Sequence, residues 1–177
     1  MRLTLHTDYA LRVLMYVGAK EDGLATIPEI VTRFDISKGH IMKVVHQLGR
    51  QGYLETIRGK GGGMRLARKS AQIAVGAVVR DMEEELGVLG CLQGGEGYCR
   101  IEGCCVLRSA LRDATNAFLA TLDGYTLEDL LRPRRALARL LELDKTSPLS
   151  SAPRSSHRRL GPAPRTVSSR GEPARGR

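Results

Sequence analysis

All four cysteines of this chain lie within fifteen residues, from Cys91 to Cys105, and this stretch constrains the fold more than any other. Glycines alternate with the cysteines there, and glycine lets a loop turn tightly because it adopts positive φ at little steric cost. Thiolates gathered on one loop are typical ligands of zinc or of an iron–sulfur cluster. The paired C-x-x-C motifs of structural zinc sites are absent, which favours a cluster.

The spacing of the cysteines supplies three of the four ligands that a metal site needs. Seven residues separate Cys91 from Cys99, and Cys104 is followed directly by Cys105. Adjacent cysteines rarely reach the same metal ion, so we expect three thiolate ligands and a fourth ligand from elsewhere. A disulfide and unconnected thiols are the alternatives. A disulfide needs an oxidising compartment, and the charged N-terminus has no long apolar core, so we expect a cytoplasmic protein.

The net charge of +9 is unevenly distributed. Residues 144–177 hold eight basic and two acidic residues, and five of the seven prolines. Apolar residues are sparse there, so we expect a basic disordered tail. The rest of the chain carries only about +3, and its aliphatic residues suffice for a core. A basic protein favours an anionic partner such as nucleic acid, but the evidence must come from where the charges of the folded part lie.

The spacing of apolar residues predicts a mainly helical fold. Thr26 and Glu29 form a capping box with Pro28 in the first turn, and Ser37 caps the next helix. The expected helices span residues 3–19, 26–34, 37–51, 71–86, 106–122, 126–131 and 133–143.

The helices that begin at Thr26 and Ser37 are short and closely connected, which is typical of a helix-turn-helix whose second helix enters the DNA major groove. The polar face of that second helix carries hydrogen-bond donors and no carboxylate, unlike an ordinary solvated face. The side chains predicted to contact DNA from this helix are Lys38, His40, Lys43 and Gln47, with Arg50 on the same side.

A strand-like pair at residues 53–58 and 64–67 flanks the glycine-rich turn 59–63. We predict a hairpin wing in which Arg58 and Lys60 contact the DNA backbone or the minor groove. The phosphate-loop pattern of nucleotide hydrolases is not present.

The predicted fold class is therefore mainly α, with four regions. They are a winged helix-turn-helix with a small β-hairpin wing (1–86), a cysteine loop (87–105), a long dimerisation helix followed by short helices (106–143), and the basic tail (144–177). In the long helix, small residues lie beside larger apolar ones and allow a second helix to approach closely. Packing within one subunit is the alternative.

The sequence indicates no enzyme, because it holds no nucleophile–base set and its four histidines are scattered. A small electron-transfer iron–sulfur protein is a rival, but such a protein needs no basic helix-turn-helix or wing.

Several segments together resemble the Rrf-two family of bacterial regulators over roughly residues 1–143. They are MRLTLHTDYALR at residues 1–12, RGKGGGMRL at 58–66, Cys99-x5-Cys105 leading into LRSAL at 107–111, and YTLEDL at 125–130. The resemblance implies a homodimer that binds double-stranded operator DNA and carries an iron–sulfur cluster, [2Fe-2S] or [4Fe-4S], in each half.

In the nitric-oxide-sensing members of this family, three loop cysteines and an acidic residue from the other subunit hold the cluster. The resemblance thus implies Cys91, Cys99, Cys105 and Asp8 as metal ligands, nitric oxide as the signal, and a repressor that releases its operators when the cluster is nitrosylated. The gap between the first two of these cysteines is longer than is usual in the family. Cys104 has no counterpart there and competes for the third thiolate position.

An alternative signal within the same family is iron–sulfur cluster supply or redox state. The family member that senses cluster supply carries a histidine three residues after its last cysteine, and this chain has Arg108 there. That difference favours nitric oxide.

Overall fold

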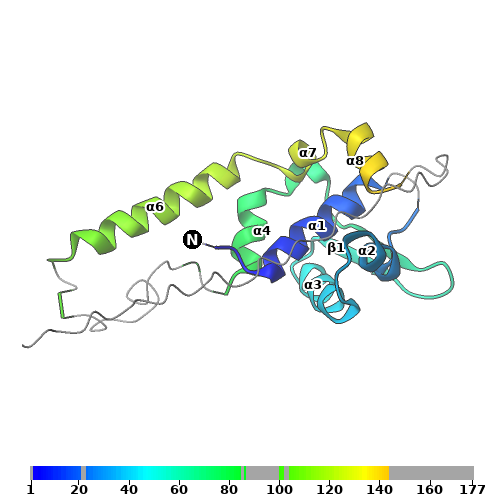
Figure 1. Ribbon diagram of the computed structural model, residues 1–177, viewed down its shortest axis with the longest axis horizontal. Coiled ribbons are helices and arrows are strands. Elements are labelled where there is room, and N and C mark those ends of the chain that lie inside the picture. The colour runs from blue at the N-terminus through cyan, green and yellow to red at the C-terminus, as the bar shows by residue number, and fades with distance from the viewer. Residues whose placement is uncertain (1, 21–22, 85, 87–99, 102–103, 144–177) are drawn as a thin grey trace, which may run out of the picture. The chain divides into compact units, whose positions relative to one another are not determined.

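The computed structural model describes residues 2–20, 23–84, 86, 100–101 and 104–143 of the chain. The predicted fold is confirmed: helices dominate, with one two-stranded antiparallel sheet (Figure 1). None of the helices in these ranges is long and apolar enough to cross a membrane. The elements are α1 (Leu5–Ala19), α2 (Ile27–Phe34), α3 (Lys38–Arg50), β1 (Leu54–Ile57), β2 (Gly63–Leu66), the 3-10 turn η1 (Ser70–Gln72), α4 (Val75–Met82), α6 (Val106–Asp123), α7 (Leu127–Leu130) and α8 (Arg134–Leu140).

Helices α2 and α3 form the predicted helix-turn-helix, and both of its predicted caps are present. The hydroxyl of Thr26 accepts a hydrogen bond from the Glu29 amide, while the Glu29 carboxylate accepts one from the Thr26 amide. The hydroxyl of Ser37 accepts from the amide of His40. Asp35 lies between the helices with φ of 53°, a left-handed conformation that turns the chain sharply into α3.

Helix α1 packs against α3, α4, α7, α8 and β2, and it lies at the centre of the part of the protein that these elements form with α2 and β1, here called the head. It buries one face from end to end, and its N-cap is Thr4, whose side-chain oxygen accepts a hydrogen bond from the Thr7 amide. Helix α3 turns its predicted apolar side, which includes Val44 and Leu48, completely into the same core. The orientation of α3 is therefore set mainly by α1 and α2.

The predicted wing is an antiparallel hairpin in which Leu54 pairs with Leu66 and Ile57 pairs with Gly63. Glycine is required in its turn, because a Cβ at Gly62 would lie 2.3 Å from the carbonyl oxygen of Ile57. A further bridge joins β2 to the segment before α2: the amide of Met64 donates to the Ala25 carbonyl at 2.7 Å. The wing is thus tied to the helix-turn-helix.

The helix predicted over residues 71–86 is shorter than expected. Before it, the chain is extended and pairs with the segment that leads into α7, with the Val75 amide donating to the Tyr125 carbonyl and the Leu127 amide to the Ile73 carbonyl, each at 2.8 Å. Backbone pairing of this kind competes with helix formation, so α4 begins only at Val75. It ends at Met82, after which Glu83 is extended.

Helix α6 has the predicted extent but little burial. Leu119 is its one buried residue, although the helix is 18 residues long. It packs on α4, where the Arg80 guanidinium forms two hydrogen bonds of 2.7 and 2.6 Å with the Asp123 carboxylate. Gly76 allows this approach, because a Cβ there would lie 2.9 Å from the Asp123 backbone nitrogen. The predicted disordered tail and most of the predicted cysteine loop lie outside the described residues.

Candidate metal centre and nucleic-acid interface

The exposed face of α3 carries three of its four predicted DNA-contacting residues. Lys38, His40 and Lys43 are all exposed. The His40 ring lies beside the ring of Tyr9 on α1, with centroids 6.0 Å apart. Positive charge on the exposed side of a helix that follows a tight turn suits contact with DNA phosphates and base edges.

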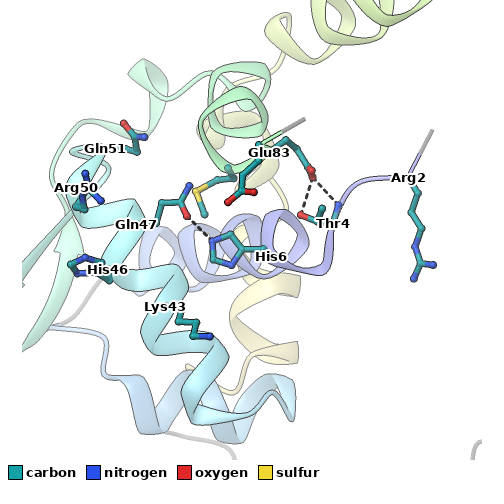
Figure 2. A pocket seen from close by; sticks show the side chains of 11 residues that line it. Arg2, Thr4, His6, Lys43, His46, Gln47, Arg50, Gln51 and Glu83 are labelled. Atoms are coloured by element: carbon teal, nitrogen blue, oxygen red, sulfur yellow. Dashed lines mark hydrogen bonds between the residues drawn. The ribbon is translucent and has the colours of Figure 1, made fainter. Parts of the chain in front are cut away.

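The fourth predicted residue, Gln47, is half-buried and bonded within the protein. Its side-chain oxygen lies 2.9 Å from Nε2 of His6 (Figure 2). Its side-chain nitrogen donates to the backbone carbonyl of Asp81 at 2.8 Å. One side chain of α3 therefore joins α1 to the C-terminal turn of α4.

A cleft of about 840 Å³ opens beside this bridge, between the start of α1, the exposed side of α3 and the end of α4. Basic side chains from the first two elements line it, and Glu83 and Glu84 line the third side (Figure 2). The Glu83 carboxylate accepts hydrogen bonds from the backbone amide of Thr4 at 2.7 Å and from its hydroxyl at 3.1 Å. The start of α1 is thus tied to the chain that leaves α4 toward the cysteines.

Met42 and His46 were not among the predicted DNA contacts, yet both are exposed on α3. They lie one turn apart, on the side of the helix that also carries Arg50. Helical spacing alone places both on the exposed side of α3, although neither belongs to the predicted set of polar side chains.

Both predicted wing residues, Arg58 and Lys60, are exposed at the turn of the hairpin. The root of the wing is fixed by Arg68, whose guanidinium donates to the carbonyls of Gly52 and Gln51 at 2.9 and 2.6 Å and stacks 4.7 Å from the centre of the Tyr53 ring. These contacts join the wing to the C-terminus of α3, so the two parts that are predicted to contact DNA are held as one unit.

Tyr53 connects the wing root to α4 as well. Its hydroxyl donates to the Asp81 carboxylate at 2.5 Å. Burial of the ring, followed by this hydrogen bond and the nearby negative charge, raises the pKa of Tyr53 well above its usual value. The hydroxyl therefore stays protonated at physiological pH. Asp81 holds the wing root through its carboxylate and α3 through its backbone carbonyl.

Asp8, the predicted fourth metal ligand, lies in the first turn of α1 with its side chain 41% exposed. The Arg12 guanidinium holds it from one turn further along, with 3.0 Å from Nε to Oδ1 and 2.8 Å from Nη2 to Oδ2. The carboxylate is therefore accessible but already paired with a cation.

Two of the predicted thiolate ligands, Cys91 and Cys99, lie outside the described residues. Cys104 is exposed, with its sulfur 3.6 Å from the Ile101 carbonyl, and Cys105 is half-buried at the N-cap of α6. The N-cap position places Cys105 directly before the first turn of α6. Within the described ranges, no three His, Cys, Asp or Glu side chains gather as a metal site.

Taken together, the helix-turn-helix, the basic exposed side of α3 and the hairpin define a winged helix, a fold typical of regulators of transcription. The same class emerges from comparison with known proteins: residues 3–133 match the family described as "Rrf2: Iron-dependent Transcriptional regulator". The chain belongs to the Rrf2 family, and the predicted resemblance is confirmed.

Several curated relatives carry one name. The chain is 48% identical over 143 residues to the HTH-type transcriptional regulator NsrR of Geobacillus kaustophilus, across 80% of this chain and 97% of that protein. It is 42% identical over 144 residues to the NsrR of Bacillus subtilis, across 81% of this chain and 99% of that protein.

Solved structures of more distant proteins share the fold. CymR, the global cysteine regulator of B. subtilis, superposes with a TM-score of 0.58 at 21% identity, across 73% of this chain and 95% of CymR. IscR of T. potens gives a TM-score of 0.59 at 21% identity, across 75% and 88%.

Proposed function

We propose that this chain is a dimeric transcriptional repressor that holds an iron–sulfur cluster and releases its operators when nitric oxide reacts with that cluster. The observation that carries the proposal is the place of Cys105. This proposed ligand forms the N-cap of α6, so the metal site adjoins the long helix whose face is largely exposed. The high identity to regulators named NsrR supports the same function.

The described head supplies the DNA-binding part. Lys38, His40 and Lys43 of α3 contact bases or phosphates in the major groove, and Arg58 and Lys60 of the wing contact the backbone. Two heads related by twofold symmetry read the two halves of an inverted repeat.

Helix α6 supplies the dimer contact. Ala110, Ala114 and Ala117 are exposed, and at the same side of the helix Leu107 is 59% exposed. This side is distinct from the one that places Leu119 and Asp123 on α4. Small residues beside a leucine let a second α6 approach closely and bury apolar area.

The ligand set combines Cys91, Cys99 and Cys105 of one subunit with Asp8 of the other. When bound, the cluster supplies iron that reacts with nitric oxide. A carboxylate would be a weaker ligand than a thiolate for such iron, so Asp8 would be the most weakly held of the four ligands. Arg12 pairs with Asp8 in the structure, so binding of the carboxylate to metal requires that this ion pair rearrange.

Anaerobic purification tests the ligand set. The absorption spectrum, iron and acid-labile sulfide are measured for the wild type, Asp8→Ala, Cys105→Ala and the neighbouring control Cys104→Ala. We expect loss of the cluster in Cys105→Ala, a changed spectrum in Asp8→Ala and an unchanged cluster in Cys104→Ala. Loss of the cluster in Cys104→Ala, with the cluster retained in Cys105→Ala, would show that Cys104 is the third thiolate ligand in place of Cys105. A wild type free of iron and sulfide would end the proposal.

Addition of nitric oxide tests the signal. Anaerobic holo-protein is mixed with a duplex selected from a random library by the wild type, and binding is followed by gel shift. We expect nitric oxide to release the duplex. Release by removal of iron or by oxidation, with no response to nitric oxide, would instead support sensing of cluster supply or redox state, a signal that the family description "iron-dependent" also favours.

A further inference from the structure

The half-buried amide of Gln47 lies on the otherwise exposed, basic side of α3. Lys43 and His46, on the same part of the helix, are exposed, whereas Gln47 turns toward His6 (Figure 2) and also bonds to Asp81. Both polar atoms of its side chain have partners, at 2.9 and 2.8 Å.

The chemistry of these partners fixes the direction of both hydrogen bonds. The Asp81 carbonyl can only accept, so the Gln47 amide nitrogen must be the donor to it. The Gln47 oxygen then faces His6 and can only accept, so His6 must carry a proton on Nε2. The network therefore runs in one direction, from His6 through Gln47 to Asp81.

The two partners lie on the elements that lead to the proposed metal ligands. His6 is two residues before Asp8 on α1, and Asp81 lies in the last turn of α4, just before the chain leaves for the cysteines. Asp81 also receives the Tyr53 hydroxyl from the root of the wing. A shift of α1 relative to α4 would thus strain one bond of Gln47 or the other.

We propose that Gln47 is a positioning residue that clamps α3 between α1 and α4, and that it carries the state of the metal site to the reading helix without contacting a base. Recognition of adenine by an amide uses its donor and its acceptor together. In Gln47 both are engaged by the protein. The positioning stands on the geometry alone, while the signal that it transmits rests on the proposed function.

The test uses two substitutions of Gln47 that remove either both of its hydrogen bonds or only one of them. Gln47→Met keeps the length of the side chain and removes both hydrogen bonds. Gln47→Glu keeps an acceptor for His6 but places a carboxylate against the Asp81 carbonyl, so it removes only the bond to α4. Gln51→Met is the matched control, because Gln51 lines the same cleft and is exposed.

Affinity for the selected duplex is measured by anaerobic fluorescence anisotropy for the holo- and apo-forms of each protein, with the absorption spectrum recorded for the same samples. We expect Gln47→Met to reduce the holo-to-apo affinity ratio by about fivefold to tenfold, the effect of roughly one neutral hydrogen bond. The spectrum should not change. Gln51→Met should keep the wild-type ratio. A merely structural role would lower thermal stability and leave the ratio intact.

A second measurement decides whether Gln47 reads a base. The wild type and Gln47→Met are compared on a panel of duplexes with single base-pair substitutions, in the form that binds best. A positioning residue lowers affinity for all of them alike. Relaxed discrimination of about tenfold or more at one base pair, with an unchanged holo-to-apo ratio, would show direct readout and overturn the proposal.

A double-mutant cycle with His6→Ala tests the bridge itself. If the two side chains act through each other, His6→Ala should change the affinity ratio little once Gln47→Met is present. Additive effects would overturn the clamp. If wild-type holo- and apo-forms bind alike, the proposed function fails, while the substitution panel and the cycle, measured on duplex affinity, still decide the role of Gln47.

Discussion

Helices α1 and α6 are both long and amphipathic, but they are buried to very different degrees. Helix α1 buries six of its 15 residues, and five elements of the same chain surround it. Helix α6 buries one of its 18 residues and packs on α4 through its C-terminal part. Leu14 on α1 is fully buried, whereas Val106 on α6 is 80% exposed.

The difference shows that an amphipathic pattern specifies a face to be covered and not what covers it. The apolar side of α1 is satisfied within the chain, so its contribution to stability is independent of assembly. The exposed apolar residues of α6 contribute only if a second molecule buries them. Substitutions in the two helices should therefore be separable, one affecting folding and the other affecting association.

The largest effect is expected from Leu14→Ala in α1. The substitution leaves a cavity among buried residues of the head, so the free energy of unfolding should fall by about 2–5 kcal/mol. Urea unfolding followed by circular dichroism measures this loss. The dissociation constant of the proposed dimer, measured in the absence of urea, should stay near the wild-type value, and a large change in it would remove the distinction between the helices.

The converse substitution is Ala114→Glu in α6. Because Ala114 is exposed in the single chain, a glutamate costs little there, but in the proposed dimer it places an unpaired charge in a close helix contact. Sedimentation should show a dissociation constant raised by about 10- to 100-fold, with urea unfolding of the head little changed. Asn116→Glu, half a turn around the helix, is the control. Equal effects of both substitutions would exclude this face as the dimer contact.

The elements that the sequence predicted correctly depend on local interactions. The capping box at Thr26 and the cap at Ser37 involve residues three positions apart, and the buried side of α3 follows from helical period alone. The start of α4 could not be predicted in this way. It depends on backbone pairing between Ala74 and Thr126, which are distant in the sequence.

In the candidate site, too, the features that depend on local sequence were predictable and those that depend on distant contacts were not. Residue type and spacing predicted the basic character of α3, and Lys38 and Lys43 are exposed as the prediction requires. The environment of Gln47 was not predictable, because its partners lie 41 and 34 positions away in the sequence. A pattern of side chains shows which groups could donate to DNA, and only the packing shows which of them are already used.

A smaller effect is expected at the contact between α4 and α6. A Cβ at Gly76 would lie 2.1 Å from a carboxylate oxygen of Asp123 and 2.9 Å from its backbone nitrogen, so Gly76→Ala must displace α6. Overpacking of this kind costs about 1–3 kcal/mol. Gly49→Ala on α3 is the control, because the atom nearest its Cβ is 3.9 Å away and alanine favours the helix by up to about 1 kcal/mol. Hydrogen exchange should show faster opening of α6 in Gly76→Ala alone.

The smallest expected effect is a difference in how acid and salt act on two carboxylates. Burial opposes ionisation of Glu29, but hydrogen bonds from Lys20 and Thr26 outweigh it and the pKa of Glu29 is lowered from 4.5. The hydrogen bonds from Arg80 lower the pKa of Asp123 from 3.8. Because both values are depressed in the folded state, each group stabilises above its unfolded pKa and loses that contribution as the pH falls through the folded pKa.

Salt should separate the two. The two pairs differ in one partner: the Lys20 side chain is 18% exposed and Glu29 40%, whereas Arg80 and Asp123 are 40% and 41% exposed, so the Lys20–Glu29 pair should lose less to screening. The free energy of unfolding of the apo-protein is measured in urea at several pH values between about 3 and 7, in low salt and in roughly 1 M salt. The wild type, Glu29→Gln and Asp123→Asn are compared. In both salts, Glu29→Gln should reduce the loss of free energy of unfolding at acidic pH by less than about 1 kcal/mol. Asp123→Asn should alter hydrogen exchange of α6 in low salt only, and an effect that persists in high salt would show that α6 is held on α4 by more than this ion pair.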